Sequence, residues 1–259
     1  MAIPLDTLQA LLSALVGAKL WPFFRIAGVV MVAPVLGARL VPVRVRAALS
    51  IALTFALAPL VPVSIGFEPW LASGVIAVHE VLLGIAMGFC LQMIFDGLVI
   101  AGQTVAMSMG LGFAMLVDPQ RGVSVPVLSQ FFVILGILVF LSVGGHLALI
   151  RMLADSFSLL PVGATLSTDS LWTLLSWGSE MFAGAVRIAI PAVTALLVVN
   201  LAFGVMSRAA PTLNLFAVGF PAALMLGFLA LMLNIRAFPG VFSDLLEAAF
   251  GTIVAMLGG

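Results

Sequence analysis

Four ionisable side chains lie within or at the edges of long apolar runs: Glu80, Asp96, Glu180 and Arg187. An ionised group in hydrocarbon costs on the order of a few kcal/mol, so such residues normally face a protein interior, a partner or water. The chemistry that they could perform is a proton or ion relay along a membrane path. The structural alternative is an internal ion pair, or a side chain that reaches the membrane surface from a helix end.

Patterns typical of catalytic or metal sites are missing from the sequence. His79 and His146 are far apart, and Cys90 is the single cysteine. His79 and Glu80 are neighbours, and neighbouring residues on a helix point about 100° apart, so they cannot share a metal ion. There is no HExxH, CxxC, P-loop or GxSxG motif. We therefore expect no enzyme, no metal site and no cofactor.

The elements that position these residues must be membrane helices. Of the 259 residues, 64% are apolar and 8% are charged, whereas soluble proteins are about 45–50% apolar and about 25% charged. The mean hydropathy is +1.34. So few charges cannot cover a soluble protein, and ten basic residues balance ten acidic ones. The composition predicts an integral membrane protein and excludes a disordered chain, a basic nucleic-acid binder and a disulfide scaffold.

Apolar runs long enough to cross a bilayer lie between the charged residues. The uncharged runs are 47–67, 97–117, 122–150, 188–207 and 209–235. Further apolar runs that contain charged residues are 8–38, 70–95 and 238–259. A transmembrane barrel would show alternation in pieces of about ten residues, which is not found here. The fold class that we expect is therefore all-α.

Small residues and prolines within the runs indicate helices that pack closely against other helices. Gly84 and Gly88 are four residues apart and give a flat face that a second backbone can approach. Pro191 and Pro221 each remove a backbone donor, which is tolerated where neighbouring helices satisfy the freed groups. These features predict packing against other subunits, and ordinary packing within one bundle is the alternative.

The segment 107–122 combines methionine, glycine and phenylalanine and ends in a turn at Asp118-Pro119. Unbranched thioethers adapt to irregular surfaces, and glycine lets the backbone bend. Non-helical backbone at membrane depth is permitted where it is buried in protein or lines a cavity. The segment therefore predicts a re-entrant or pore-lining loop, and a ragged helix end with incidental methionines is the alternative.

The order and spacing of several motifs resemble the FliR/SctT family of type III export-gate proteins over essentially the whole chain. The matching residues are Arg25-Ile-Ala-Gly28, Ala33 to Gly37, Gly112-Phe113, Val117 to Gln120, Phe140 to His146, Ser156-Phe157, Leu160 to Gly163, and Ala210 to Pro221.

This resemblance implies kinked helical hairpins with a re-entrant plug loop. A FliP-like N-terminal part, 1–175, would be joined to a FliQ-like C-terminal hairpin, 176–259. The plug loop would be 107–122, with Phe113 as the central occluder and with Met107, Met109 and Met115 as a soft seal on the hinges Gly110 and Gly112. Asp118 and Pro119 would form the turn. Subunit packing would involve Gly84, Gly88, Pro211, Asn214, Phe216, Gly219 and Pro221.

The function that the resemblance implies is a structural pore subunit of the flagellar type III export gate. Its partners would be FliP-like and FliQ-like subunits, an FlhB-like subunit, exported flagellar proteins in transit and the lipid bilayer, with no nucleic acid. It would lie in the bacterial inner membrane within the flagellar basal body. The equivalent subunit of a virulence injectisome and a polytopic secondary transporter are the alternatives, the latter suggested by broken helices and intramembrane acids.

Overall fold

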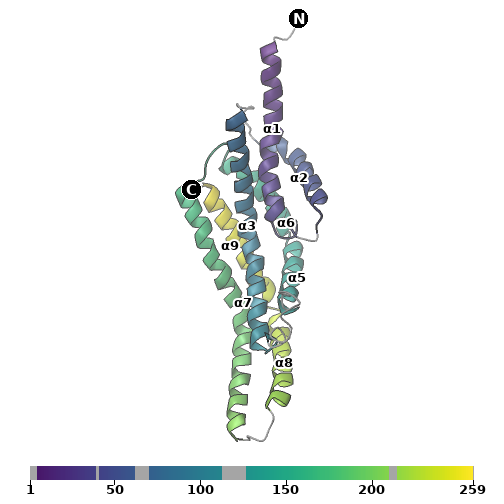
Figure 1. Ribbon diagram of the computed structural model, residues 1–259, viewed down its shortest axis with the longest axis vertical. Helices are drawn as coiled ribbons and strands as arrows, with labels where there is room; N and C mark the ends of the chain where they lie inside the picture. Colours follow the sequence, from purple (N-terminus) through teal and green to yellow (C-terminus); the bar gives the residue numbers. More distant parts are fainter. Residues whose placement is uncertain (1–4, 39–40, 62–69, 113–126, 210–214, 259) are drawn as a thin grey trace. The chain divides into compact units, whose positions relative to one another are not determined.

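The computed structural model describes residues 5–38, 41–61, 70–112, 127–209 and 215–258, and the regular elements among them are all helices (Figure 1). In chain order these are α1 (Leu5–Val32), α2 (Val43–Leu57), the short 3-10 helix η1 (Ala58–Leu60), α3 (Trp70–Ser108), α5 (Val127–Ser142), α6 (Gly145–Leu159), α7 (Thr168–Ala209), α8 (Leu215–Asn234) and α9 (Phe238–Gly258).

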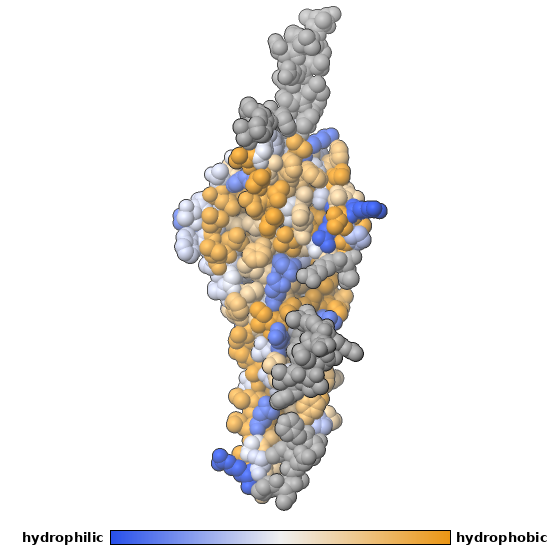
Figure 2. Space-filling model, in the orientation of Figure 1, coloured by the Kyte–Doolittle hydropathy of each residue, from blue (hydrophilic) through white to orange (hydrophobic). Residues whose placement is uncertain are grey.

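Helices long and apolar enough to cross a membrane make up much of the described chain. Four pass by length and composition, namely α2 with η1, α3, α7 and α9, and a fifth is reached if α5 and α6 count as one broken span. Apolar side chains cover most of the visible surface (Figure 2). The protein is thus an all-α integral membrane protein, as its composition predicts. The re-entrant part of the prediction falls mostly on residues 113–126, outside the described ranges.

Helix α3 continues through Asp96, where the sequence analysis placed a boundary between two apolar runs. The runs 70–95 and 97–117 were expected as separate helices, but residues 70–108 form one helix of 39 residues. A charged side chain does not interrupt the i to i−4 hydrogen bonds of the backbone, and no proline or positive-φ glycine falls within these residues to do so. The charge of Asp96 makes its burial unfavourable, but it does not end the helix.

The run 122–150 was expected as one span, but it contains two helices. It divides into α5 and α6, because Gly144 adopts a left-handed conformation with φ of 74°. A right-handed helix cannot pass through that conformation, which glycine reaches at no steric cost. The two helices belong to different compact units of the chain.

The two compact units are interleaved along the sequence. Unit 1 comprises Met1–Met93, Gly144–Gly178 and Glu247–Gly259, and unit 2 comprises Ile94–Val143 and Ser179–Leu246. The predicted boundary between residues 175 and 176 lies inside α7, close to the point between Gly178 and Ser179 where the chain passes from unit 1 to unit 2. Whether the two predicted parts are FliP-like and FliQ-like stays a prediction.

In unit 1, helices α1 and α3 cross at a contact between glycines. A Cβ atom on Gly28 would meet the carbonyl oxygen of Val81, and one on Gly84 would meet the carbonyl oxygen of Arg25. Gly88 likewise faces the backbone of Val29 in α1 and of Ala33 directly after it. The face that we predicted for subunit packing at Gly84 and Gly88 is therefore occupied by α1 of the same chain.

Unit 2 is held by an alanine-rich stripe of α7 and a group of phenylalanines. Ala189, Ala192 and Leu196 are buried against the end of α3 and against α8. The ring of Phe95 makes edge contacts with Phe140 and Phe242. The small side chains let the helix backbones approach, while the rings fill the wider spaces.

Candidate functional site

The described part of the predicted plug segment, residues 107–112, lies at the C-terminal end of α3. The N–H of Leu111 donates to the carbonyl of Ala106 at 3.0 Å, and the N–H of Gly110 donates to the carbonyl of Met107 at 3.0 Å. Gly110 has φ of 82°. This pattern is a Schellman C-cap, in which a left-handed glycine satisfies the last helical carbonyls. The segment therefore leaves α3 through an ordered helix stop.

The two described methionines of the segment have different environments. Met107 is 58% exposed, whereas Met109 is 1% exposed. Met109 packs against Gly227 of α8, where its sulfur and methyl group fill the position that a Cβ would take. The sulfur of Met107 lies over Gly112 in the same way. Met107 therefore lies mostly exposed on the surface of unit 2, while Met109 belongs to the core of unit 2.

A cavity of about 420 Å³ adjoins this helix end within unit 2. Residues from three helices line it: Met107, Ser108, Met109 and Gly110 from the end of α3, Asn200, Phe203, Gly204 and Ser207 from α7, and Gly219, Phe220 and Ala223 from α8. The lining is mainly apolar, with one amide and two hydroxyl groups. Such a surface can hold back hydrated ions, because it offers few ligands to replace their water.

The structure brings only some of the predicted site residues together. Met107, Met109, Gly110 and Gly219 border the cavity, and Gly112 contacts Met107. Pro221 lies exposed on α8, and Gly84 and Gly88 lie in unit 1. Phe113, Met115, Asp118, Pro119, Pro211 and Asn214 lie outside the described residues, as does the side chain of Phe216.

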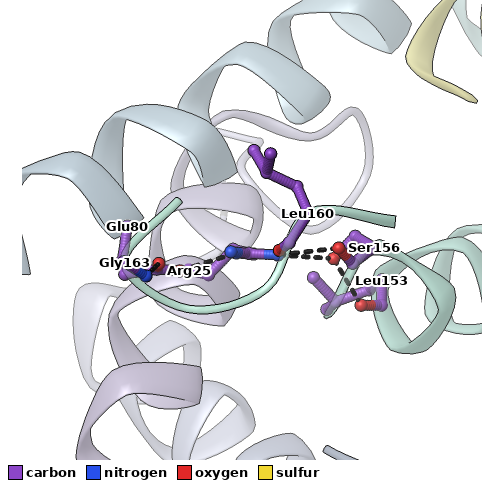
Figure 3. Close-up of polar contacts among 6 residues, drawn as sticks. All are labelled: Arg25, Glu80, Leu153, Ser156, Leu160 and Gly163. Carbon is purple, nitrogen blue, oxygen red and sulfur yellow. Dashed lines mark hydrogen bonds and ion pairs between the residues drawn. The ribbon is translucent and has the colours of Figure 1, made fainter. Parts of the chain in front are cut away.

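A second polar feature, in unit 1, is a buried ion pair between α1 and α3. The Nε of Arg25 lies 2.7 Å from Oε2 of Glu80, and both side chains have no exposed surface (Figure 3). The pattern of charges indicated that Glu80 needs a partner, but it did not single out Arg25. The available signal was that each is an isolated charge of opposite sign in an apolar run, and such charges require pairing.

The pair also holds the end of α6 and the loop that follows it. Nη1 of Arg25 donates to the carbonyl oxygens of Ser156 at 2.9 Å and Leu160 at 3.0 Å. The C-terminal carbonyls of a helix carry partial negative charge, which favours a cation there. The guanidinium also lies 4.4 Å from the ring centroid of Phe157. Oε1 of Glu80 accepts the N–H of Gly163 at 3.3 Å. Three distant segments are thereby joined at one buried point.

This arrangement favours the structural interpretation of Glu80 over a proton relay. A relay group needs access to water or to a neighbouring relay group, and neither Glu80 nor Arg25 has exposed surface. Glu180 and Arg187 form a long, largely exposed contact of 3.9 Å on α7. Among the described residues, no three His, Cys, Asp or Glu side chains gather as a metal site would require.

Comparison with known proteins relates this chain to one family of bacterial export proteins. Residues 16–249 match the family described as "Bacterial export proteins, family 1". The chain is 40% identical over 213 residues to flagellar biosynthetic protein FliR of Escherichia coli (strain K12), covering 80% of each chain. It is 34% identical over 238 residues to that of Pectobacterium carotovorum, covering 92% of this chain and 91% of the relative. The relative from Aquifex aeolicus is 34% identical over 215 residues, covering 82% of this chain and 83% of the relative.

Proposed function

This chain belongs to family 1 of the bacterial export proteins, and we propose that it is a structural pore subunit of the flagellar type III export gate. In this role it assembles with FliP-like and FliQ-like subunits, and with an FlhB-like subunit, in the bacterial inner membrane at the flagellar basal body. Unfolded flagellar proteins pass through the assembly. The family resemblance that the sequence motifs indicated is confirmed, and the three relatives named above are all flagellar proteins.

The lengths of the helices support a subunit of a larger assembly. Helix α3 has 39 residues and α7 has 42, which at about 1.5 Å per residue gives roughly 58 and 63 Å. The hydrocarbon core is about 30 Å thick. Helices twice that length extend past the core or tilt strongly. Most of α7 is nevertheless apolar and exposed, with only 17% of its most apolar stretch buried. Partner subunits would cover such a surface.

The single observation that carries the pore role is the end of α3. An exposed methionine, a glycine helix stop and a mainly apolar cavity of about 420 Å³ occur together there. An idle secretion pore must retain ions, yet an export pore must admit side chains of every type. A methionine seal meets both needs, because its displacement breaks dispersion contacts of only about 0.1–0.2 kcal/mol per atom pair. The subunit catalyses no reaction in this account, so the energy for export comes from other components.

Assembly is tested by co-purification. The full chain, tagged and co-expressed with the FliP-like and FliQ-like proteins of the same genome, is extracted in mild detergent. We expect both small membrane proteins to co-purify in fixed ratio with the chain. An unrelated polytopic protein with the same tag provides the control. Recovery of the chain alone, under conditions that keep the FliP-like and FliQ-like proteins bound to each other, would contradict the proposal.

Function is tested by deleting the gene in a flagellated host. Secretion of flagellar subunits into the medium should stop and should return when the intact chain is supplied. If the deletion strain secretes normally, the export role is wrong. A secondary transporter would instead give substrate-dependent uptake by vesicles that contain the purified chain alone.

A further inference from the structure

The cavity at the end of α3 contains a polar group that an apolar seal does not need, the side-chain amide of Asn200 on α7. Asn200 borders this cavity of about 420 Å³ and is exposed. Among the described residues, none forms a hydrogen bond with its side chain. The amide offers two donors and one acceptor oxygen. On a helix that is apolar enough to cross a membrane, such a group requires a partner, because an unpaired amide in apolar surroundings is unfavourable.

Two hydroxyl groups of the same cavity add acceptors. The hydroxyl of Ser108 donates to the carbonyl oxygen of Thr104 at 2.9 Å, and that of Ser207 donates to the carbonyl oxygen of Gly204 at 2.7 Å. Each hydroxyl proton is therefore used within its own helix, whereas the lone pairs of the oxygen can accept a further hydrogen bond. Together with the Asn200 amide, the lining can accept from N–H groups and donate to carbonyl groups.

Glycines leave two helix backbones uncovered in the cavity lining. Nothing lies within 4 Å of the Cβ position of Gly204 on α7, and the nearest atoms to that of Gly219 on α8 belong to Phe203 at 3.9 Å. Met107, which is 58% exposed, and Phe220, which is 40% exposed, also border the cavity. The cavity therefore has room for another backbone to come close to α7 and α8, with large apolar side chains beside it.

The hydrogen-bonding groups of the lining favour an extended polypeptide as the occupant. A lipid tail has no group that can pair with an amide or a hydroxyl. A partner helix uses its backbone N–H and carbonyl groups internally. An extended chain presents an unpaired N–H and carbonyl at every residue except proline, which lacks the N–H. The volume of about 420 Å³ also lies within the range of about 300–1,000 Å³ that is usual for ligand pockets.

We propose that this cavity binds the backbone of an extended polypeptide in transit, through the amide of Asn200 and the hydroxyl oxygens of Ser108 and Ser207. The proposed export function, on which this inference rests, supplies the unfolded chain. Because backbone groups are alike in nearly all residue types, these contacts hold a chain without selecting its sequence. Met107 and Phe220 contact the passing side chains by dispersion, and a thioether adapts to different shapes. The hydrogen bonds are few, so the chain can move on.

The occupant is identified by photo-crosslinking in the complete gate. A benzophenone amino acid replaces Asn200 or, as the matched control, Val198, which is 62% exposed on the same helix and does not border the cavity. An export substrate is fused to a domain that resists unfolding, so that an extended segment stays in the gate. We expect the crosslink to this substrate to be several-fold stronger from position 200 than from position 198. It should persist when the stalled segment is replaced by an unrelated sequence.

Two substitutions test the hydrogen bond itself. Asn200→Leu removes the amide at similar size, whereas Asn200→Gln keeps an amide. Secretion of flagellar subunits should fall about fivefold in Asn200→Leu, which corresponds to the loss of one net hydrogen bond, and it should stay near the unmodified rate in Asn200→Gln. Both variants should still co-purify with the FliP-like and FliQ-like subunits, because the inference assigns the amide to the substrate.

Three results would overturn the inference. A crosslink from position 200 to a partner subunit, or no crosslink to the stalled substrate, would give the cavity another occupant or none. Loss of co-purification in Asn200→Leu would place the amide in a subunit interface. Equal secretion by the leucine and glutamine variants would show that the amide forms no hydrogen bond that matters for transit. Failure of the export function is a different result, in which deletion of the gene leaves secretion intact.

Discussion

The guanidinium of Arg25 and the carboxylate of Glu80 are in contact at 2.7 Å with no exposed surface on either side chain, although 55 positions separate them in the sequence. Through this pair, α1 and α3 are joined to the end of α6 and to the loop at Gly163. The contact is therefore the polar centre of unit 1. Its contribution to the free energy of unfolding can be measured, because each of the two charges can be removed separately by substitution.

Removing one partner of this pair should be strongly destabilising. Arg25→Met leaves a buried carboxylate without its cation, and Glu80→Gln leaves a buried guanidinium, so each should cost about 3–5 kcal/mol in the free energy of unfolding. The double variant should cost less than the sum of the two. Thermal unfolding of the full chain in mild detergent, followed by circular dichroism, gives these values.

The exposed pair of Glu180 and Arg187 provides the matched control. Its 3.9 Å separation and its exposure predict a loss of less than about 1 kcal/mol for Glu180→Gln. If Glu80→Gln were as mild as Glu180→Gln, the structural role assigned to Glu80 would be wrong.

The glycine contact between α1 and α3 predicts opposite effects for two glycine-to-alanine changes. Gly84→Ala places a methyl group against the backbone carbonyl of Arg25, which cannot move aside as a side chain would. Overpacking of this kind costs about 1–3 kcal/mol. Gly178, inside α7, has no atom near its Cβ position, so Gly178→Ala should be neutral or stabilise by about 0.5–1 kcal/mol. The same unfolding assay compares them, and equal effects would rule out the close crossing.

Met107 and Met109 are predicted to have separable roles. Met109→Ala leaves a cavity beside Gly227 in the core and should cost about 2–5 kcal/mol. Met107→Ala removes an exposed side chain and should change stability by less than about 0.5 kcal/mol. In the assembled gate, Met107→Ala should raise ion leakage across the membrane, which conductance of reconstituted vesicles measures. An unaltered leak would remove Met107 from the proposed seal.

The remainder of the predicted plug segment, 113–122, can be deleted separately from its described part. This deletion keeps Met109, which belongs to the core of unit 2, and the helix stop at Gly110. Gates that contain this variant should conduct small ions while idle, because the proposed closure is lost. Only assemblies that still co-purify with the FliP-like and FliQ-like subunits are compared with the unmodified gate. Conductance equal to that of the intact gate would show that 113–122 closes nothing.

Membrane insertion, helical fold and family could all be predicted from the amino-acid sequence. Insertion and helicity follow from the mean composition and from runs of apolar residues, which are local properties that no tertiary contact can reverse. The start of the Met/Gly segment also had a local signal, since Gly110 fits a left-handed helix stop. The family followed from motif order along the chain.

Pairing and burial were decided only by the tertiary structure. Glu80 could be marked as a charge that needs a partner, but the crossing of α1 and α3 selects Arg25. Gly84 could be marked as a close-contact residue, but the same crossing directs it to α1 of its own chain. Met107 and Met109 have identical side chains two positions apart, and only packing against α8 buries the second. The type of a side chain determines how unfavourable its burial or exposure is. Which neighbour packs against it or pairs with it depends on which helices are in contact.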